Sequence, residues 1–442
     1  MSRNRRTLSA ALVGALVVSG SVLLAAPPAA AATTHVPATA IAPDSTSYLG
    51  WHAEAGTFAD AWNGLRVGAG ADSYILNGLV ASGAPGLTTT GTALGALITS
   101  ASITGVGSVQ MEVPISVGAV NPPASDSWAT LYSRYSVIGA SPQLTDLWIS
   151  SRAITLNGAN VPANAPLPLG DILAELDVAG DVKYSGYGFY AADQSPAAAV
   201  ASMTFGADTT TFGRIVSPVA ASSTVAVASS DIRPDETSYP GWHEGYANAT
   251  PAFAVDSDGL RLGIGANSQI INGLATPLAT TDPFSLLVSA SVTVASGEAF
   301  LQVPVFFGPG TDFATLRPAA GAGAGTTGVA LTDQWMSSRA IPATAATPAI
   351  AANTPIVLGD LLEALLAQGG SLRVLAFGVL AQATAPTVVT AIVWNGVTYS
   401  FVPTLAATGV QGLVLPASAA GAALLLGGLL LLLRRRLARR GV

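Results

Sequence analysis

The sequence contains no cysteine, only three histidines and a single lysine, Lys183. The absence of cysteine excludes disulfides, thiol catalysis, iron–sulfur clusters and thiolate zinc sites. Charged residues make up only 10% of the 442 positions. The stability of the fold therefore has to come from packing and hydrogen bonds.

The few cations are concentrated at the two ends of the chain. Arg3, Arg5 and Arg6 stand near the N-terminus, and five more arginines lie among the last nine residues. Without these eight, 10 cations remain against 25 acids, so the net charge of the body is near −15. A nucleic-acid backbone requires a cationic face on its partner. We therefore expect no nucleic-acid binding, and the acidity favours solubility outside the cell.

Residues 1–32 have the pattern of a secretion signal. Three arginines precede an apolar core around residues 10–24, and small residues follow it. Ala30-Ala31-Ala32 fits the small-x-small rule, which predicts cleavage by signal peptidase after Ala32. The pair Arg5-Arg6 leaves general secretion and twin-arginine export both open.

The body of the chain consists of one unit written twice. "PDSTSYLGWHAE" (43–54) returns as "PDETSYPGWHEG" (234–245), and "LTDLWISSRAI" (144–154) returns as "LTDQWMSSRAI" (331–341). Corresponding segments keep their order at offsets of 187 to 195 residues, which indicates a tandem duplication.

The units span residues 40–217 and 231–401, joined by a small-residue linker at 218–230. Strand patterns recur in both, with β-branched and aromatic residues at 96–104, 109–117, 182–191, 286–293, 301–307 and 387–401. Asn395-Gly396 predicts a hairpin turn. Short helices are expected at 170–176 and 359–366, with Asp171 and Asp360 as capping residues. The fold class is therefore all-β, with two tandem homologous β-sandwich modules, for which a jelly roll is one topology.

Both copies retain a set of polar and aromatic residues. The pairs are Asp44/Asp235, Tyr48/Tyr239, Trp51/Trp242, His52/His243, Arg66/Arg261, Asp146/Asp333, Trp148/Trp335, Arg152/Arg339 and Asp171/Asp360. Two interpretations stay open for Trp51, His52, Trp148, Arg152, Trp242, His243, Trp335 and Arg339. They either anchor the cores, with the indole N–H groups bonded to carbonyls, or line a groove where aromatic faces stack on a sugar or peptide.

Catalytic patterns are absent from the repeated units. Glycosidases need two carboxylates at a controlled separation, but Glu54 and Glu244 are displaced by one position in the two copies, and Glu112 has no clear counterpart. No His-Glu-x-x-His, Gly-x-Ser-x-Gly or phosphate-loop motif occurs in them. A calcium site through Asp44/Asp235 or Asp146/Asp333 lacks an acid-rich loop. We therefore expect no catalytic residue, metal or cofactor.

The C-terminal 40 residues carry three signals in series. The uncharged run at 410–433 has 24 residues, more than the ~20 that span a hydrocarbon core. The arginine-rich tail at 434–442 is expected to stay in the cytoplasm. Directly before the run stands "LAATG", Leu405, Ala406, Ala407, Thr408 and Gly409.

A pentapeptide, an apolar span and a basic tail in this order resemble the sorting signals of sortase substrates in Gram-positive bacteria. "LAATG" is similar to the LAxTG variant used by class E sortases of high-GC actinobacteria. The resemblance implies that a sortase cleaves the Thr408–Gly409 bond and transfers Thr408 to an amine of the cell-wall peptidoglycan. It covers only these last residues, and the family of the repeated units is not identified by it.

These observations together predict a non-enzymatic surface protein, adhesin-like or structural, anchored outside the cell to the wall. Its expected partners are signal peptidase, a sortase as the enzyme that processes it, peptidoglycan, and a glycan or a host or surface protein as ligand. Duplication favours binding because two tethered sites gain avidity. The alternatives are a carbohydrate-binding surface module and an extracellular glycan hydrolase. For location, the alternative is a single-pass plasma-membrane protein with its N-terminus outside.

Overall fold

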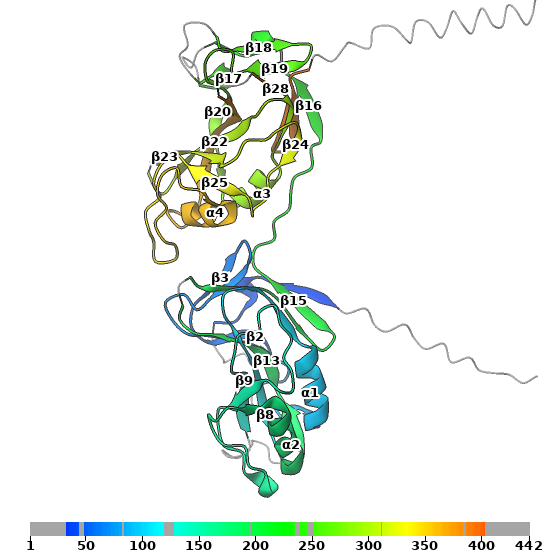
Figure 1. Cartoon of the computed structure of the whole chain (residues 1–442). Coiled ribbons are helices and arrows are strands. Elements are labelled where there is room, and N and C mark those ends of the chain that lie inside the picture. The colour runs from blue at the N-terminus through cyan, green and yellow to red at the C-terminus, as the bar shows by residue number, and fades with distance from the viewer. Residues whose placement is uncertain are drawn as a thin grey trace, which may run out of the picture.

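The computed structural model describes residues 32–43, 48–81, 84–118, 128–194, 196–234, 239–245, 251–310, 312–382 and 386–402. This part of the chain is mostly β-strand with four short α-helices, so the all-β prediction is confirmed. Its strands form four sheets. Two lie in the first half (residues 32–216) and two in the second half (residues 217–402), as Figure 1 shows.

The first half contains a six-stranded sheet and a nine-stranded sheet. The smaller sheet has the order β1-β15-β14-β4-β3 with β7 beside β14, and its strands are β1 (Thr33–Val36), β3 (Phe58–Ala61), β4 (Gly64–Val67), β7 (Ser102–Val106), β14 (Ala198–Phe205) and β15 (Asp208–Phe212). The larger has the order β11-β10-β9-β8-β13-β5-β2, with β12 beside β8 and β6. Its strands are β2 (Gly50–Ala55), β5 (Ser73–Gly78), β6 (Leu87–Thr89), β8 (Gln110–Ser116), β9 (Trp128–Ser133), β10 (Leu147–Ser150), β11 (Leu167–Pro168), β12 (Val182–Tyr184) and β13 (Gly186–Ala191). The helices are α1 (Gly91–Ser100), α2 (Leu169–Ala179) and the 3-10 turns η1 (Ala38–Ala40) and η2 (Leu156–Gly158).

The second half contains two seven-stranded sheets. One has the order β16-β29-β28-β19-β18 with β21 and β24 beside it, and its strands are β16 (Ser223–Ala226), β18 (Phe253–Asp256), β19 (Gly259–Leu262), β21 (Ser291–Ser296), β24 (Gly325–Gly328), β28 (Thr387–Trp394) and β29 (Val397–Ser400). The other has the order β17-β20-β27-β22-β23-β25-β26, and its strands are β17 (Gly241–Glu244), β20 (Ser268–Thr280), β22 (Phe300–Phe307), β23 (Asp312–Pro318), β25 (Gln334–Ser337), β26 (Ile356–Val357) and β27 (Leu372–Ala381). The helices are α3 (Pro283–Val288), α4 (Leu358–Leu366) and the turn η3 (Ser229–Asp231).

The strand pairing of the second half repeats that of the first. The path β2-β5-β13-β8-β9-β10-β11 has the same pattern as β17-β20-β27-β22-β23-β25-β26. Each half also opens with an edge strand in parallel pairing, β1 with β15 and β16 with β29. Each has its own buried core with side chains from both of its sheets and from a helix. Examples are Leu65, Met111 and Leu173 in the first half, and Leu260, Val303 and Leu361 in the second.

Most strands expected from the sequence are present, as β8, β22, the pair β12–β13 and the pair β28–β29. The hairpin at Asn395-Gly396 is confirmed. These two residues join β28 to β29 with φ values of 47° and 77°. Both values lie in the left-handed region that a two-residue hairpin turn requires.

The strands expected at 96–104 and 286–293 begin later than predicted, because a helix occupies the first part of each segment. Helix α1 ends at Ser100 and α3 at Val288, so β7 and β21 begin only at Ser102 and Ser291. Side chains before the helices decide this. Thr90 accepts a hydrogen bond from the Ala93 N–H, and Asp282 accepts one from the Ser285 N–H, which is the geometry of an N-cap.

Helices at 170–176 and 359–366 are confirmed as α2 and α4, but the capping role of their aspartates is wrong. The N-cap residues are Pro168 and Val357, and neither side chain makes a capping hydrogen bond. Asp171 and Asp360 lie in the first helical turn, where a negative charge is favourable at the N-terminal end of the helix dipole.

The edges of the folded units differ from the expected ones. The segment 218–230, assigned above to a linker, contains β16, which pairs residue by residue with β29. In the first half, β1 lies before residue 40 and starts at Thr33, directly after the predicted signal-peptidase site. Small residues with little apolar periodicity form both edge strands, so their sequence alone does not predict pairing.

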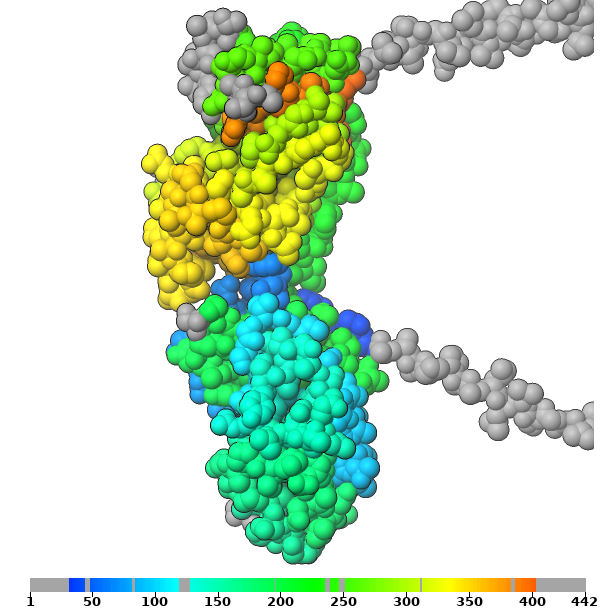
Figure 2. Space-filling view, viewed as in Figure 1, coloured from blue at the N-terminus to red at the C-terminus, as the bar shows by residue number. Residues whose placement is uncertain are grey.

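The two halves touch where the turn between β3 and β4 meets helix α4, and Figure 2 shows this turn, in blue, against the yellow second half. Trp62 Nε1 donates to Asp360 Oδ1 at 2.9 Å, and the indole covers Gly359 so closely that a Cβ there has no room. Arg214 lies nearby, with its guanidinium 4.7 Å from the Phe284 ring and Nε 3.9 Å from a Glu363 carboxylate oxygen.

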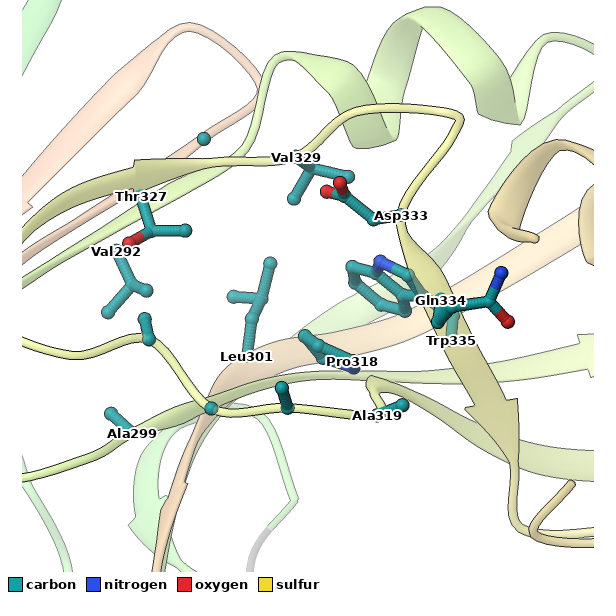
Figure 3. A pocket seen from close by; sticks show the side chains of 14 residues that line it. Val292, Ala299, Leu301, Pro318, Ala319, Thr327, Val329, Asp333, Gln334 and Trp335 are labelled. Atoms are coloured by element: carbon teal, nitrogen blue, oxygen red, sulfur yellow. The ribbon is translucent and has the colours of Figure 1, made fainter. Parts of the chain in front are cut away.

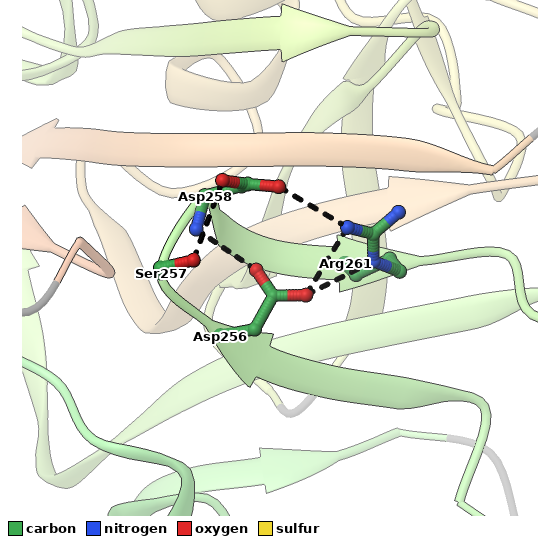
Figure 4. Close-up of polar contacts among 4 residues, drawn as sticks. All are labelled: Asp256, Ser257, Asp258 and Arg261. Atoms are coloured by element: carbon green, nitrogen blue, oxygen red, sulfur yellow. Dashed lines mark hydrogen bonds and ion pairs between the residues drawn. The ribbon is translucent and has the colours of Figure 1, made fainter.

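The equivalent turn of the second half, between β18 and β19, carries Asp256, Ser257 and Asp258 where the first half has Ala61, Trp62 and Asn63. Arg261 Nη2 lies 3.1 Å from Asp256 Oδ2 and 3.5 Å from Asp258 Oδ2 (Figure 4). This charged turn is therefore satisfied within itself.

Candidate functional site

The tryptophans that both copies retain pack in the cores. The expected hydrogen bond of the indole N–H is wrong for Trp148, whose Nε1 is buried without a partner in the described part of the chain. Trp148 and Trp335 are 0% and 1% exposed and occupy equivalent places on β10 and β25. Trp242 is also buried, and Trp51 is half-buried with its ring edge-on to Phe212. Four strands separate Trp148 on β10 from Trp51 on β2, so the sheet does not bring the two into one groove.

The retained histidines are held by their own strands. His52 and His243 are buried, and Nδ1 of each lies 2.9 Å from the carbonyl oxygen two residues earlier, Gly50 or Gly241. Both glycines have φ near +87°, at 86° and 88°, a conformation that other residues rarely adopt. The motif Gly-Trp-His thus specifies a local backbone shape in each half.

Of the retained arginines, Arg152 and Arg339 are exposed, whereas Arg66 and Arg261 are half-buried. Arg152 stacks on Trp128, with its guanidinium carbon 3.7 Å from the ring centroid, and Trp128 is itself 37% exposed. The Arg339 backbone exchanges hydrogen bonds with the Ser337 hydroxyl. Residues Leu405, Ala406, Ala407, Thr408 and Gly409 of the sorting motif lie outside the described residues, as do Asp44 and Asp235.

A polar row that the sequence did not predict crosses the larger sheet of the first half. Backbone register places Tyr132, Glu112, Gly188, Leu76 and His52 side by side on five neighbouring strands. Residues opposite one another in adjacent strands point to the same face. Since Met111 and Val113 on either side of Glu112 point into the core, this row lies on the other face of the sheet.

Two polar members of the row, Glu112 and His52, are nevertheless shielded from water, whereas Tyr132 is half-buried. Glu112 is 1% exposed and His52 is 0% exposed. Within the described part of the chain, Glu112 Oε1 and His52 Nε2 have no hydrogen-bond partner. An unpaired buried polar atom costs about 1–3 kcal/mol, so this row reduces the stability of the first half.

Burial and neighbouring charge perturb the acids of this row. Burial raises the pKa of the Glu112 carboxyl well above its usual range, and the charge of Glu54 raises it further. Partial burial also raises the pKa of Glu54, against the opposing influence of His52. Burial, with the charge of Glu112, raises the pKa of Tyr132 to about 12. The coupling between Glu54 and Glu112 favours a protonated Glu112.

Two coupled carboxyl groups are a requirement of glycoside hydrolysis, but a catalytic acid must also reach its substrate. Glu112 lies beneath the surface and cannot do so in this structure. Nor do three histidines or acids converge to hold a metal ion anywhere in the described ranges.

The second half has a version of the same row without the acid, and Arg317 follows in it at the place of Tyr132. Gln302 pairs with Gly378, Gly378 with Ile271, and Ile271 with His243. Gln302 thus occupies the place of Glu112, and its amide oxygen accepts a hydrogen bond from Gln269 Nε2. The counterpart of Glu112 is therefore a glutamine, and the sequence agrees with the strand register, because Glu112-Val113-Pro114 matches Gln302-Val303-Pro304 at an offset of 190 residues.

In both halves, an exposed aromatic residue and a nearby arginine lie at the same end of the corresponding sheet. Trp128 pairs with Ser116 and Phe313 with Phe306, at equivalent ends of the hairpins β8–β9 and β22–β23. Phe313 is 41% exposed, and Arg373 lies 5.3 Å from the centroid of the Phe306 ring. Trp128 is the first residue of β9, and Phe313 is the second residue of β23.

Searches of protein-family models, of curated proteins and of solved structures found no match to this chain. Among the residues that the structure describes, no helix is long and apolar enough to cross a membrane, and the predicted span at 410–433 lies outside them.

Proposed function

We propose that this is a secreted, non-enzymatic surface protein that is covalently attached to the cell wall through Thr408 and presents two tandem homologous β-sandwich modules. The observation that supports it most directly is the sorting signal that follows the last described strand of the second half in the sequence. Strand β29 ends at Ser400, Phe401 is fully buried, and only Val402, Pro403 and Thr404 precede Leu405 of "LAATG". The modules therefore sit directly at their attachment point.

Secretion is supported by the position of the first described strand, β1. Cleavage after Ala32 releases the leader but leaves β1, from Thr33, paired along β15. Cleavage a few residues later would remove an edge strand. We therefore expect the mature protein to begin at Thr33.

A structural or adhesive role is supported by how the retained residues are used. The tryptophans and histidines that occur twice maintain the fold of each module, as described above. The halves also make direct contact through Trp62 and Asp360. A pair of modules joined in this way suits a short, rigid extension of the wall.

Mass spectrometry of cell walls after muralytic digestion tests the anchor. In the cells that make the protein, we expect a C-terminal peptide that ends at Thr408 and carries a peptidoglycan fragment. The variant Thr408→Ala should move the protein from the wall fraction to the membrane, whereas the control Thr404→Ala, four residues upstream, should leave it in the wall. A peptide that extends past Gly409 and occurs only in the membrane fraction would overturn the proposal in favour of a plain membrane protein.

Carbohydrate binding is the second candidate, favoured by Trp128 and Arg152. An exposed indole stacked on a guanidinium offers a flat face to a sugar ring and hydrogen-bond donors to its hydroxyls. On a glycan array, Trp128→Ala should then abolish binding while Trp148→Phe, within the core, retains it. Equal binding by the Trp128→Ala variant would exclude this edge as the sugar site.

A further inference from the structure

A pocket of about 350 Å³ opens beside Trp335 in the second half (Figure 3). Its walls are mainly apolar and small, with Leu301, Pro318 and Val329 around the indole. Pockets that hold small ligands in proteins begin at roughly 300 Å³. The size therefore suits a compound of about one ring.

The first half has a smaller pocket at the equivalent place. There the cavity measures about 190 Å³ and is lined by Tyr135 and Val137. Register fixes the correspondence, because Ser133 and Pro318 both pair with the core tryptophan of their half. Counting on from these pairs, Tyr135 corresponds to Ala320 and Val137 to Ala322. Tyr135 is 64% exposed and so only borders the smaller hollow, whereas Val137 is buried in its wall. Alanine at both positions leaves the second pocket with smaller walls.

The small-residue wall is fixed in place, so the pocket does not close by collapse of this segment. The Gly321 N–H donates to Glu298 Oε1 at 3.0 Å. Ala322 exchanges two backbone hydrogen bonds with Ala299, at 2.7 and 3.0 Å. Beyond it, β24 pairs with β21.

Asp333 supplies the charge of the pocket. Of the lining residues that the structure describes, it is the one with an acidic or basic side chain. Figure 3 shows its carboxylate near Val329 and above the Trp335 indole, whereas the Gln334 amide points away. Asp333 Oδ2 accepts a hydrogen bond from the Ala330 N–H at 2.8 Å, which holds the carboxylate in position. An apolar cavity with an anion at one end is complementary to an apolar body with a cationic end.

We propose that this pocket binds a small amine with an apolar body of about one aromatic ring, whose ammonium group meets Asp333 while the ring lies among Leu301, Pro318 and Trp335. The smaller hollow of the first half lacks room for the ring.

Three probes of one shape test the proposal on the unmodified protein. Benzylamine, toluene and benzoate share the ring and differ in the charge of the end group. The full chain is held in lipid nanodiscs, with empty nanodiscs as the blank, and binding is followed by saturation-transfer NMR and by titration. We expect benzylamine to bind with a dissociation constant on the order of 1 mM. Toluene should bind more weakly, and benzoate weakest.

Two variants with matched controls locate the site. Asp333→Asn keeps the acceptor for the Ala330 N–H and removes the charge, so it should weaken benzylamine about tenfold and leave toluene unchanged. Asp146→Asn, the same change in the first half, should alter neither. Ala320→Tyr introduces the side chain of the smaller hollow and should abolish binding of both probes, with circular dichroism to verify the fold. Equal affinity for benzylamine and benzoate, or no response to Asp333→Asn, would overturn the proposal, as would failure of every probe to bind.

Discussion

The two halves share one order of strand pairing, and they differ at positions whose side chains lie outside the core. In the first half, the buried row on the outer sheet face carries Glu112, and the β3–β4 turn carries Trp62. In the second, the same places hold Gln302 and Ser257, while the pocket beside Trp335 is widened. The core residues maintain the same fold in both halves. Positions outside the core have diverged: Trp62 of the first half contacts the second half, and the second half has the larger pocket beside Trp335.

The largest expected effect concerns the core tryptophans. Trp148→Ala should lower the free energy of unfolding of the first half by about 3–5 kcal/mol, the range for large-to-small changes in a closed core. Trp335→Ala should cost less in the second half, because one side of Trp335 already faces a cavity. Urea denaturation and, separately, calorimetry measure the loss of unfolding free energy in each variant. Equal losses would mean that the two surroundings are energetically the same.

How far the sequence predicted these cores depends on the kind of signal. Duplicated segments revealed Trp148 and Trp335 as important, but two identical letters do not say whether an indole faces a core or a groove. Burial decided that question. Glu112 was missed for a related reason. Its counterpart Gln302 can be read from the matching segments Glu112-Val113-Pro114 and Gln302-Val303-Pro304, but the sequence does not show that the carboxyl group is buried.

Local conformations were predicted where the residue types themselves determine them, and not where distant contacts do. Asn395-Gly396 predicted its turn because positive φ at both positions is a property of those residue types. The edge strands β1 and β16 were not predicted, because their small residues pair with β15 and β29 only through contacts made far along the chain.

The second prediction exchanges the acid and the amide of the polar row. Because the folded-state pKa of Glu112 is raised, the folded protein binds more protons than the unfolded chain, and stability falls as pH rises from ~4.3 through the raised pKa. Glu112→Gln should remove this loss and stabilise the first half by about 1–3 kcal/mol at pH 7, with no gain near pH 4. The reverse change, Gln302→Glu, should destabilise the second half at pH 7 and not near pH 4. Thermal unfolding from pH 4 to 8 measures both, and a gain independent of pH would show that charge is not the cause.

The third prediction compares the effect on stability of a Gly→Ala change at equivalent positions of α4 and α2. Gly359→Ala places a methyl group into the Trp62 indole and should weaken the contact between the halves, at a cost of about 1 kcal/mol from the lost Trp62–Asp360 hydrogen bond. Gly170→Ala in α2 meets nothing closer than 3.4 Å and should stabilise its helix by about 0.5–1 kcal/mol.

A double-mutant cycle identifies the source of that difference. In a Trp62→Ala background, Gly359→Ala should become favourable and behave like Gly170→Ala, since the indole that excluded the methyl group is gone. Calorimetry gives the stabilities, and small-angle scattering should show the halves spreading apart only in the variants that disturb Trp62. A cost at Gly359 that persists without Trp62 would place its origin within α4.

The smallest effect is expected from the retained arginines of the β3–β4 and β18–β19 turns. The Asp258 N–H chiefly lowers the pKa of Asp256, and Arg261 lowers it further, so the ion pair contributes above the unfolded pKa of Asp256 and is lost as pH falls through the lowered value. Because both partners are exposed, Arg261→Ala should shift the melting temperature by less than about 1 °C in physiological salt.

Arg66 occupies the same position in the first half but acts on the buried Glu363, whose pKa it lowers against the larger effect of burial. Arg66→Ala should therefore destabilise the contact more than Arg261→Ala destabilises its turn, and the difference should persist at high salt because buried charges are screened less. Equal and salt-sensitive effects would mean that Arg66, like its counterpart, interacts through solvent.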